Sequence, residues 1–271
     1  MDAEAHGRVS SFMRSAIVVT STFTDIVVNY PLWVYAKRMQ AALGAPKVTE
    51  LYKGAGSLLF CSGPMITVQD FSTGAILKLF SSEVSANAAH AMSACLSGAI
   101  GALTVGSQVE SVITRAHASG TSVFSVIQKT YATGGIAALV APYGGLMVAA
   151  REIPYAGTLF FLSGWLNSRL RVLSDSDERG SHLGLDVLTA LCSAAVAGPV
   201  SHAPSVIASH QQARSVTVSA ACREIAATGG LTSFYRGLVP RTLTLAGSLF
   251  VIPLTIRELQ PLIELREKTI S

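Results

Sequence analysis

Six long segments of the sequence are rich in small and apolar residues and contain few charges. They lie at about 11–41, 58–81, 86–118, 143–171, 183–213 and 238–266. A helix needs about 20 residues to cross the hydrocarbon core of a bilayer, and each segment is at least that long. Charged residues make up only 13% of the chain, whereas soluble domains average roughly 25%. The sequence therefore predicts an all-α membrane protein with six transmembrane helices.

Small residues gather within these segments, and shorter amphipathic stretches lie between them. The runs "SGAIGALTVGS" (97–107) and "AAVAGPV" (194–200) predict close contacts between helices, because small side chains let backbones approach. The stretch 122–132 places Val123, Val126, Ile127 and Tyr131 on one stripe, and 216–230 is similar. Both are typical of helices that lie in the membrane interface. The polar connection 173–182 is predicted to be a solvated loop.

The charges outside the predicted helices are unevenly distributed. Loops after the first, third and fifth helices hold nine basic and two acidic residues, a net charge of +7. The opposite side, with both termini, holds nine basic and ten acidic residues, a net charge of −1. Because basic loops tend to remain on the side from which a membrane protein inserts, the amphipathic helices are predicted on one side and both termini on the other.

Several kinds of function are not expected from this chain. The four cysteines, at positions 61, 95, 192 and 222, are far apart and suggest neither a metal site nor a disulfide framework. His202 and His210 have no acidic or thiol ligand nearby in the sequence. We find no phosphate-binding loop and no nucleophile with a base at usable spacing. We therefore expect no enzyme, no metal, no other cofactor and no nucleic-acid partner.

The chain also contains a weak internal repeat. The segments "ELYKGAGSLLFCSGP" (50–64), "ALVAPYGGLMVAAREIP" (138–154) and "SFYRGLVPRTLTLAG" (233–247) recur at intervals of about 90 residues. In each, a turn follows a short amphipathic stretch and leads into a predicted membrane helix. This pattern predicts one domain over 1–271, built from repeats at approximately 1–82, 83–173 and 174–271.

These features resemble the mitochondrial carrier family, and the resemblance covers essentially the whole chain. "PLWVYAKRMQ", "REIPYAG" and "FYRGLVPR" are the most similar stretches. The resemblance implies six transmembrane helices in three repeats of two, each repeat with a short amphipathic helix on the matrix side. It also implies a location in the mitochondrial inner membrane, with both termini facing the intermembrane space.

The family signature on the odd-numbered helices consists of a proline, an acid, a base, a second base and a glutamine. The matching residues retained here are Pro31, Arg38, Gln40, Arg115 and Gln212, together with the acid Glu110. At the other gate positions the acids or bases are replaced by Trp33, Ala36, Ile113, Ser205 and Ala208. We expect that no acid–base pair of the matrix-side gate remains. Glu110 would then bind Arg115, another polar neighbour or water, or become protonated.

The resemblance also indicates where a substrate would bind. Carriers contact their substrates about one turn before the proline of each even-numbered helix, which here gives Ser62, Arg151, Glu152 and Thr244. The Arg151 and Glu152 pair is similar to that of carriers for amino acids or S-adenosylmethionine, and it could hold a zwitterion. Alternatively, Arg151 forms a structural pair with Glu152, Asp70 or Glu110. Asp25 and Arg241 are expected to be structural partners. Carriers have a second gate on their even-numbered helices, and we expect that gate to be absent here.

Two functional hypotheses follow from the resemblance. The loss of both gates favours a protein that no longer transports and serves as a structural accessory subunit of a respiratory or ATP synthase complex. The alternative is a working carrier for an amino acid or an S-adenosylmethionine-like zwitterion. In both cases the resemblance implies contact with the lipid bilayer, including cardiolipin at the matrix-side helices.

Overall fold

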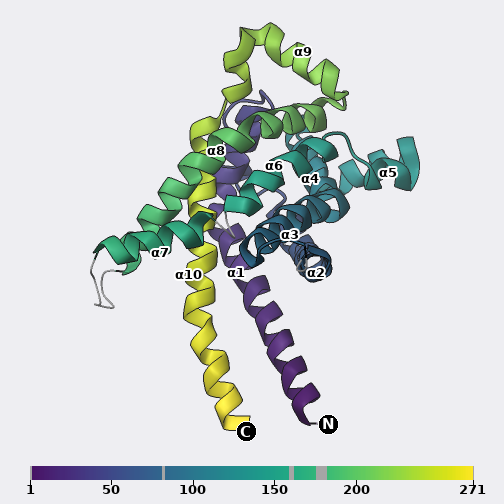
Figure 1. Cartoon of the computed structure of the whole chain (residues 1–271). Coiled ribbons are helices and arrows are strands. Elements are labelled where there is room, and N and C mark those ends of the chain that lie inside the picture. Colours follow the sequence, from purple (N-terminus) through teal and green to yellow (C-terminus); the bar gives the residue numbers. More distant parts are fainter. Residues whose placement is uncertain (1, 81–82, 159–161, 175–181, 271) are drawn as a thin grey trace.

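The computed structural model describes residues 2–80, 83–158, 162–174 and 182–270 (Figure 1). Its helices are α1 (Asp2–Gln40), α2 (Ala55–Phe80), α3 (Ala86–Gly101), α4 (Ser107–Ser119), α5 (Val123–Val140), α6 (Gly145–Gly157), α7 (Ser163–Ser174), α8 (His182–Arg214), α9 (Val218–Gly229) and α10 (Leu238–Ile270). A π-helical turn, Ala102–Gly106, joins α3 to α4, and short 3₁₀ helices cover Val48–Glu50 and Gly230–Tyr235. The described ranges contain no strand, so the all-α prediction is confirmed.

The long helices close into a ring. Along this ring α1 packs on α2, α2 on α3, α3 on α6, α6 on α8, α8 on α10, and α10 returns to α1. Figure 1 shows both termini at one end of the molecule, which we call the terminal end, and α9 at the other, which we call the α9 end. The termini and the helix at 216–230 thus lie at opposite ends of the molecule, and their placement on opposite sides of a membrane stays a prediction.

Five described segments are long and apolar enough to cross a membrane. They are Ala16–Gln40, Ala86–Ser119, Val123–Val140, Leu183–Arg214 and Leu238–Leu259. The predicted spans at 58–81 and 143–171 are not among them. Polar and charged residues such as Gln69 and Lys78 lower the hydropathy of α2, and the second span is divided between α6 and α7, on either side of residues 159–161, which lie outside the described part. The prediction holds as an all-α membrane protein, but not as six spans.

Helix contacts are made largely by small residues, as predicted for 97–107 and 194–200. The buried face of α3 consists of Ala89, Ser93, Ala94, Ser97, Gly98 and Gly101. A Cβ atom at Gly98 would lie 3.0 Å from that of Ala156 on α6, so the two backbones pack tightly there. Ala194 and Ala197 of α8 are buried with Leu245 of α10. Because lipid gives little hydrophobic drive for helices to associate, such close packing stabilises the bundle.

Three turns in the left-handed conformation fix where α2, α6 and α10 begin. The residues at these turns are Gly54 (φ +91°), Gly144 (φ +89°) and Gly237 (φ +78°). A Cβ atom at the first would lie 3.1 Å from Ile113, one at the second 3.0 Å from the carbonyl oxygen of Ala208, and one at the third 3.4 Å from that of Ala36. A positive φ and this close approach together require glycine. Each turn thus holds one helix start against the end of α4, α8 or α1.

The two amphipathic stretches behave differently. α9 covers most of the predicted stretch 216–230 and buries Ala221 and Ile225. α5 is longer than predicted and buries only Val126 and Thr130, so most of the predicted stripe does not pack on the protein. Phe124, at 67% exposed, and Ile136, at 66%, face outward, and α5 projects from the ring (Figure 1). Of the predicted loop 173–182, residues 175–181 lie outside the described residues.

Candidate functional site

A cavity of about 970 Å³ lies inside the ring. Its walls come from α1, α2, α3, α4, α6, α10 and the π-helical turn. On α1 the lining runs from Val18 to Trp33, and on α10 from Arg257 to Arg241. The cavity therefore begins near the terminal end and stops at Trp33 and Arg241, which we call its floor.

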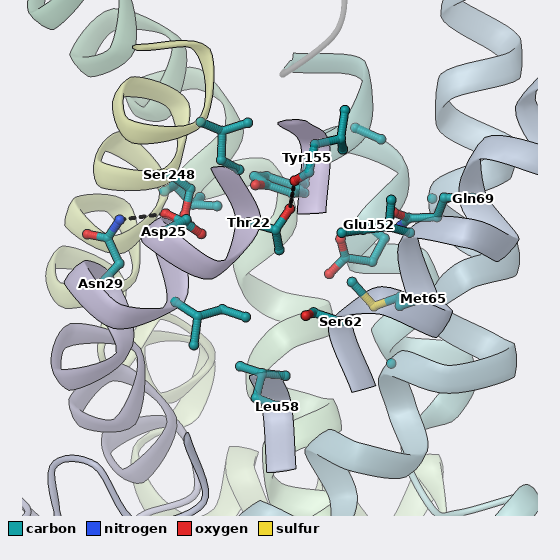
Figure 2. A pocket seen from close by; sticks show the side chains of 18 of the residues that line it. Thr22, Asp25, Asn29, Leu58, Ser62, Met65, Gln69, Glu152, Tyr155 and Ser248 are labelled. Atoms are coloured by element: carbon teal, nitrogen blue, oxygen red, sulfur yellow. Dashed lines mark hydrogen bonds between the residues drawn. The ribbon is translucent and has the colours of Figure 1, made fainter. Parts of the chain in front are cut away.

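All four predicted substrate contacts line this cavity. Arg151 and Glu152 come from α6, Ser62 from α2 and Thr244 from α10. Figure 2 shows Glu152 and Ser62 among the side chains that face the open space. The hydroxyl of Ser62 donates to the carbonyl of Leu59 at 2.7 Å, and that of Thr244 to the carbonyl of Pro240 at 2.8 Å. Each hydroxyl oxygen can still accept a hydrogen bond, but neither hydrogen is free for a ligand.

A buried charge network closes the cavity floor. Glu110 of α4 forms an ion pair with Lys37 of α1, and its Oε2 lies 2.9 Å from Nη1 of Arg151 on α6. Arg151 also donates from Nε to Oε1 of Glu152 at 2.9 Å. The side chains of Lys37, Glu110 and Arg151 are each at most 7% exposed. Four alternating charges from three helices are thus joined in one layer.

This network contradicts the prediction that no acid–base pair remains at the gate. The family signature places a base at position 36, where Ala36 is found, and the prediction overlooked Lys37. Residues three and four positions after Trp33 lie on the same side of a helix, so Lys37 can also reach the interior. Its Nζ atom lies 5.8 Å from the Trp33 ring centroid. Lys37 is one of the nine basic residues that the sequence analysis assigned to loops, and that assignment was wrong. Of the partners considered for Glu110, the structure has Arg151 and not Arg115.

A second polar layer lies beneath the floor, toward the α9 end. Ser205 and Ser209 of α8 approach Oε1 of Gln40 at 3.0 Å each, and Lys37 donates to Ser209, also at 3.0 Å. Gln212 accepts from Thr114 at 3.2 Å. The retained glutamines therefore connect α1, α4 and α8 below the charge network.

The remaining signature residues are structural in this conformation. Ala36, Ile113, Ser205 and Ala208 are buried, and Trp33 stacks on Tyr30 with ring centroids 5.3 Å apart. Pro31 lies within α1. Arg38 pairs with Glu50 at 3.3 Å, and a hydrogen bond from the Lys47 backbone lowers the pKa of Glu50.

Two charged cavity residues, Asp25 and Arg241, were expected to pair but do not. Asp25 accepts from Asn29 at 2.6 Å and from Ser248 at 3.0 Å. Arg241 is 7% exposed, its Nε atom has no hydrogen-bond partner, and no ion pair between described residues includes it. Sequence reasoning could not predict this, because ion pairing depends on where both side chains lie in three dimensions.

The mouth of the cavity has a charge cluster that the sequence analysis missed. Asp186 of α8 pairs with Arg257 of α10 and lies 3.6 Å from Arg171 of α7. Asn167 donates to the same carboxylate at 2.9 Å. The prediction that the second gate is absent considered only the second, fourth and sixth predicted segments. Asp186 lies in the fifth predicted segment, 183–213. Arg115, the last retained signature base, donates to Thr130 and Ser215 instead.

Histidines and cysteines form no metal site in the described part of the chain. His202 lies 3.1 Å from the carbonyl of Arg236. His210 contacts Glu224 of α9 at 2.8 Å, and Arg214 contacts the same carboxylate at 3.3 Å. These contacts lower the pKa of Glu224, the hydrogen bond from His210 contributing most. These two histidines thus contact segments at the α9 end of the molecule.

No protein-family model matches this chain, and a search of the curated proteins finds no similar sequence.

Proposed function

We propose that this chain is a carrier-fold membrane protein that binds a small polar solute in its central cavity. The observation that carries the proposal is a cavity of about 970 Å³ that reaches toward the terminal end and is closed at its floor by the network of Lys37, Glu110, Arg151 and Glu152. A site of this size holds a metabolite. Charged side chains inside a membrane bundle usually mark a pathway or a binding site.

The ring supports the carrier part of the proposal. The three left-handed turns approach Ala36, Ile113 and Ala208, which are the three positions where the carrier signature has its base. One contact is therefore made three times around the ring, as three repeats over about 1–82, 83–173 and 174–271 would require. On this proposal α2 forms one membrane-crossing unit and α6 with α7 forms another, while α5 does not cross. Together with α1, α3 with α4, α8 and α10 these units number six.

The charge layers support transport as the activity. Alternating access needs two conformations of similar free energy, each held by its own contacts. The floor network would hold the conformation seen here, with the cavity accessible from the terminal end. The amino-acid or S-adenosylmethionine-like zwitterion implied by Arg151 and Glu152 remains the starting substrate class. No chemical conversion is proposed, since the role is binding and passage.

Thermal unfolding tests the binding step. The full chain in mild detergent would be heated with L-arginine, L-glutamate, S-adenosylmethionine or inorganic phosphate. A solute that binds only the folded protein at 100 times its Kd adds about 2.7 kcal/mol to the free energy of unfolding. We expect one solute to raise the unfolding temperature reproducibly. If none of the four does so up to millimolar concentrations, the proposed substrate classes are wrong.

A second candidate function is a structural accessory subunit of a respiratory or ATP synthase complex. The observation in its favour is α5, which is apolar, projects from the ring and is mostly exposed (Figure 1). That surface would contact either a neighbouring subunit or lipid such as cardiolipin. Native gel electrophoresis with mass spectrometry separates the two functions, because an accessory subunit migrates in stoichiometric amounts with its host.

Both candidates share one proposed location, the mitochondrial inner membrane with both termini facing the intermembrane space. The arrangement that supports it is the common end of the two termini, opposite α9 (Figure 1).

A further inference from the structure

The floor of the cavity carries an excess of positive charge. Of the residues that the structure describes, Lys37, Arg151 and Arg241 lie there with only Glu110 and Glu152 against them, which leaves one positive charge uncompensated. Among the described residues, no ion pair includes Arg241, and its Nε atom has no hydrogen-bond partner. Burying a guanidinium without hydrogen bonds is unfavourable, because its lost hydration is not replaced. This end of the cavity therefore suits an anionic group.

A negative charge lies in the cavity closer to the terminal end than Arg241. The carboxylate of Asp25 receives hydrogen bonds from two neutral side chains, Asn29 and Ser248, and it forms no ion pair with any other described residue. In Figure 2 it lies beside the open space, across from Glu152. A carboxylate has more acceptor capacity than these two bonds use. This part of the cavity suits a cationic group.

The two charges are separated along α10. Ser248, which contacts Asp25, follows Arg241 by seven residues, which is two helical turns or about 10 Å. Between them the wall presents Thr244 and Leu245. The spacing is too long for the adjacent charges of a simple α-amino acid, but it fits a chain of several bonds.

The Arg151 and Glu152 pair is less suited to this task. Arg151 is bound to both Glu110 and Glu152, so a solute would have to break a buried ion pair in order to reach it. Arg241 needs no such exchange.

We propose that the cavity binds an elongated dipolar solute lengthwise, with its anionic group on Arg241 and its cationic group on Asp25. This inference rests on the solute-binding function proposed above. It identifies two residues outside the predicted contacts and a substrate class with separated charges.

Tryptophan fluorescence can test the inference directly. The sequence has two tryptophans, and Trp33 lines the cavity floor. In a Trp165→Phe background, the signal of Trp33 reports on the cavity of the full chain in detergent. The probes are ε-aminocaproate, which is dipolar, caproate, which has one anionic end, adipate, which has two, and glycine, which is short.

We expect ε-aminocaproate to bind most tightly and adipate to be rejected by Asp25. Arg241→Gln should weaken ε-aminocaproate by about tenfold to a hundredfold, the range expected for a hydrogen bond to a charged group, and Arg241→Lys should restore part of the loss. Asp25→Asn should remove the preference for ε-aminocaproate over caproate. Arg223→Gln, an exposed change on α9, should alter nothing. Circular dichroism would confirm that each variant is folded.

Two results would overturn the inference. Equal binding of adipate and ε-aminocaproate would show that Asp25 does not select a cation, and unchanged affinity in folded Arg241→Gln would show that Arg241 does not hold the anion. Either result leaves the solute-binding function standing. A silent Trp33 with every probe, together with stoichiometric migration in a larger complex, would instead reject both proposals.

Discussion

Lys37 on α1 and Glu110 on α4 form a buried ion pair that joins helices 73 positions apart in the chain. Arg151 binds the other side of the same carboxylate. This one carboxylate therefore holds α1, α4 and α6 together at the level where the cavity ends. Its loss should loosen the floor and destabilise the whole ring.

Glu110→Gln tests this relationship. Removing one partner of a buried ion pair typically costs about 3 to 5 kcal/mol, because the remaining charges stay buried without compensation. We expect a loss of that size, measured by thermal or denaturant unfolding in detergent. The double variant Lys37→Met with Glu110→Gln should recover part of it, because Arg151 keeps Glu152. If Glu110→Gln is no more harmful than the change Glu258→Gln, whose side chain is 67% exposed, the floor network does not stabilise the fold.

Gly54→Ala tests the left-handed turns. An L-residue with φ near +91° is strained, and the new Cβ atom would lie 2.9 Å from Tyr30 Oη and 3.1 Å from Ile113. The expected loss is about 1 to 3 kcal/mol of unfolding free energy. Gly56→Ala is the matched control, because nothing lies within 4 Å of its Cβ position and it is helical. Equal effects of the two changes would remove the special role of the turn.

Glu224 predicts how the attachment of α9 depends on pH. Its pKa in the folded protein is lowered by His210, so its contribution is present above the unfolded value of about 4.3 and is lost as pH falls through the folded pKa. The protection factors of the α9 amides, which correct the exchange rates for their intrinsic dependence on pH, should therefore fall on acidification in the native chain. Glu224→Gln should exchange faster at neutral pH and respond less to acid. A native chain with α9 protection that is constant down to acidic pH would contradict the prediction.

Protease protection tests the proposed location and orientation. Epitope tags at either end should both be cleaved in mitochondria whose outer membrane is opened, while a tag in the turn between α8 and α9 should survive until the inner membrane is dissolved. The common end of the termini in Figure 1 is the reason for expecting the first two tags to behave alike. Cleavage of only one terminal tag would rule out the ring as the membrane arrangement.

The sequence predicted the helices well because long apolar segments have few alternatives in a membrane. The repeated stretches around Gly54, Gly144 and Gly237 marked three helix starts, and a strict glycine requirement makes such turns visible in a sequence. The four residues predicted as substrate contacts all line the cavity, and their contact with a solute stays a prediction. These features depend on local hydropathy, on glycines at turns and on motif spacing, all of which can be recognised in a single sequence.

Other features depended on which side chains meet in space. Lys37 was overlooked because the family motif assigns the base to position 36 alone. Positions 36 and 37 of the helix can both face the interior of the bundle. Asp186 of α8 pairs with Arg257 of α10, whereas the family's second gate is expected on the second, fourth and sixth predicted segments. α5 was expected to lie in the membrane interface, and it buries one residue of its apolar stripe, Val126, together with Thr130 outside the stripe. Pairing and docking of this kind require the three-dimensional arrangement.

Uptake into proteoliposomes tests the central claim most directly. Liposomes that contain the full chain and are preloaded with unlabelled S-adenosylmethionine or L-arginine would be given the same compound in labelled form, with Arg241→Gln and protein-free liposomes alongside. We predict saturable exchange of at least one compound, strongly reduced in the variant. Exchange no faster than in protein-free liposomes, from a preparation shown to be folded, would contradict the carrier function and favour the accessory-subunit role.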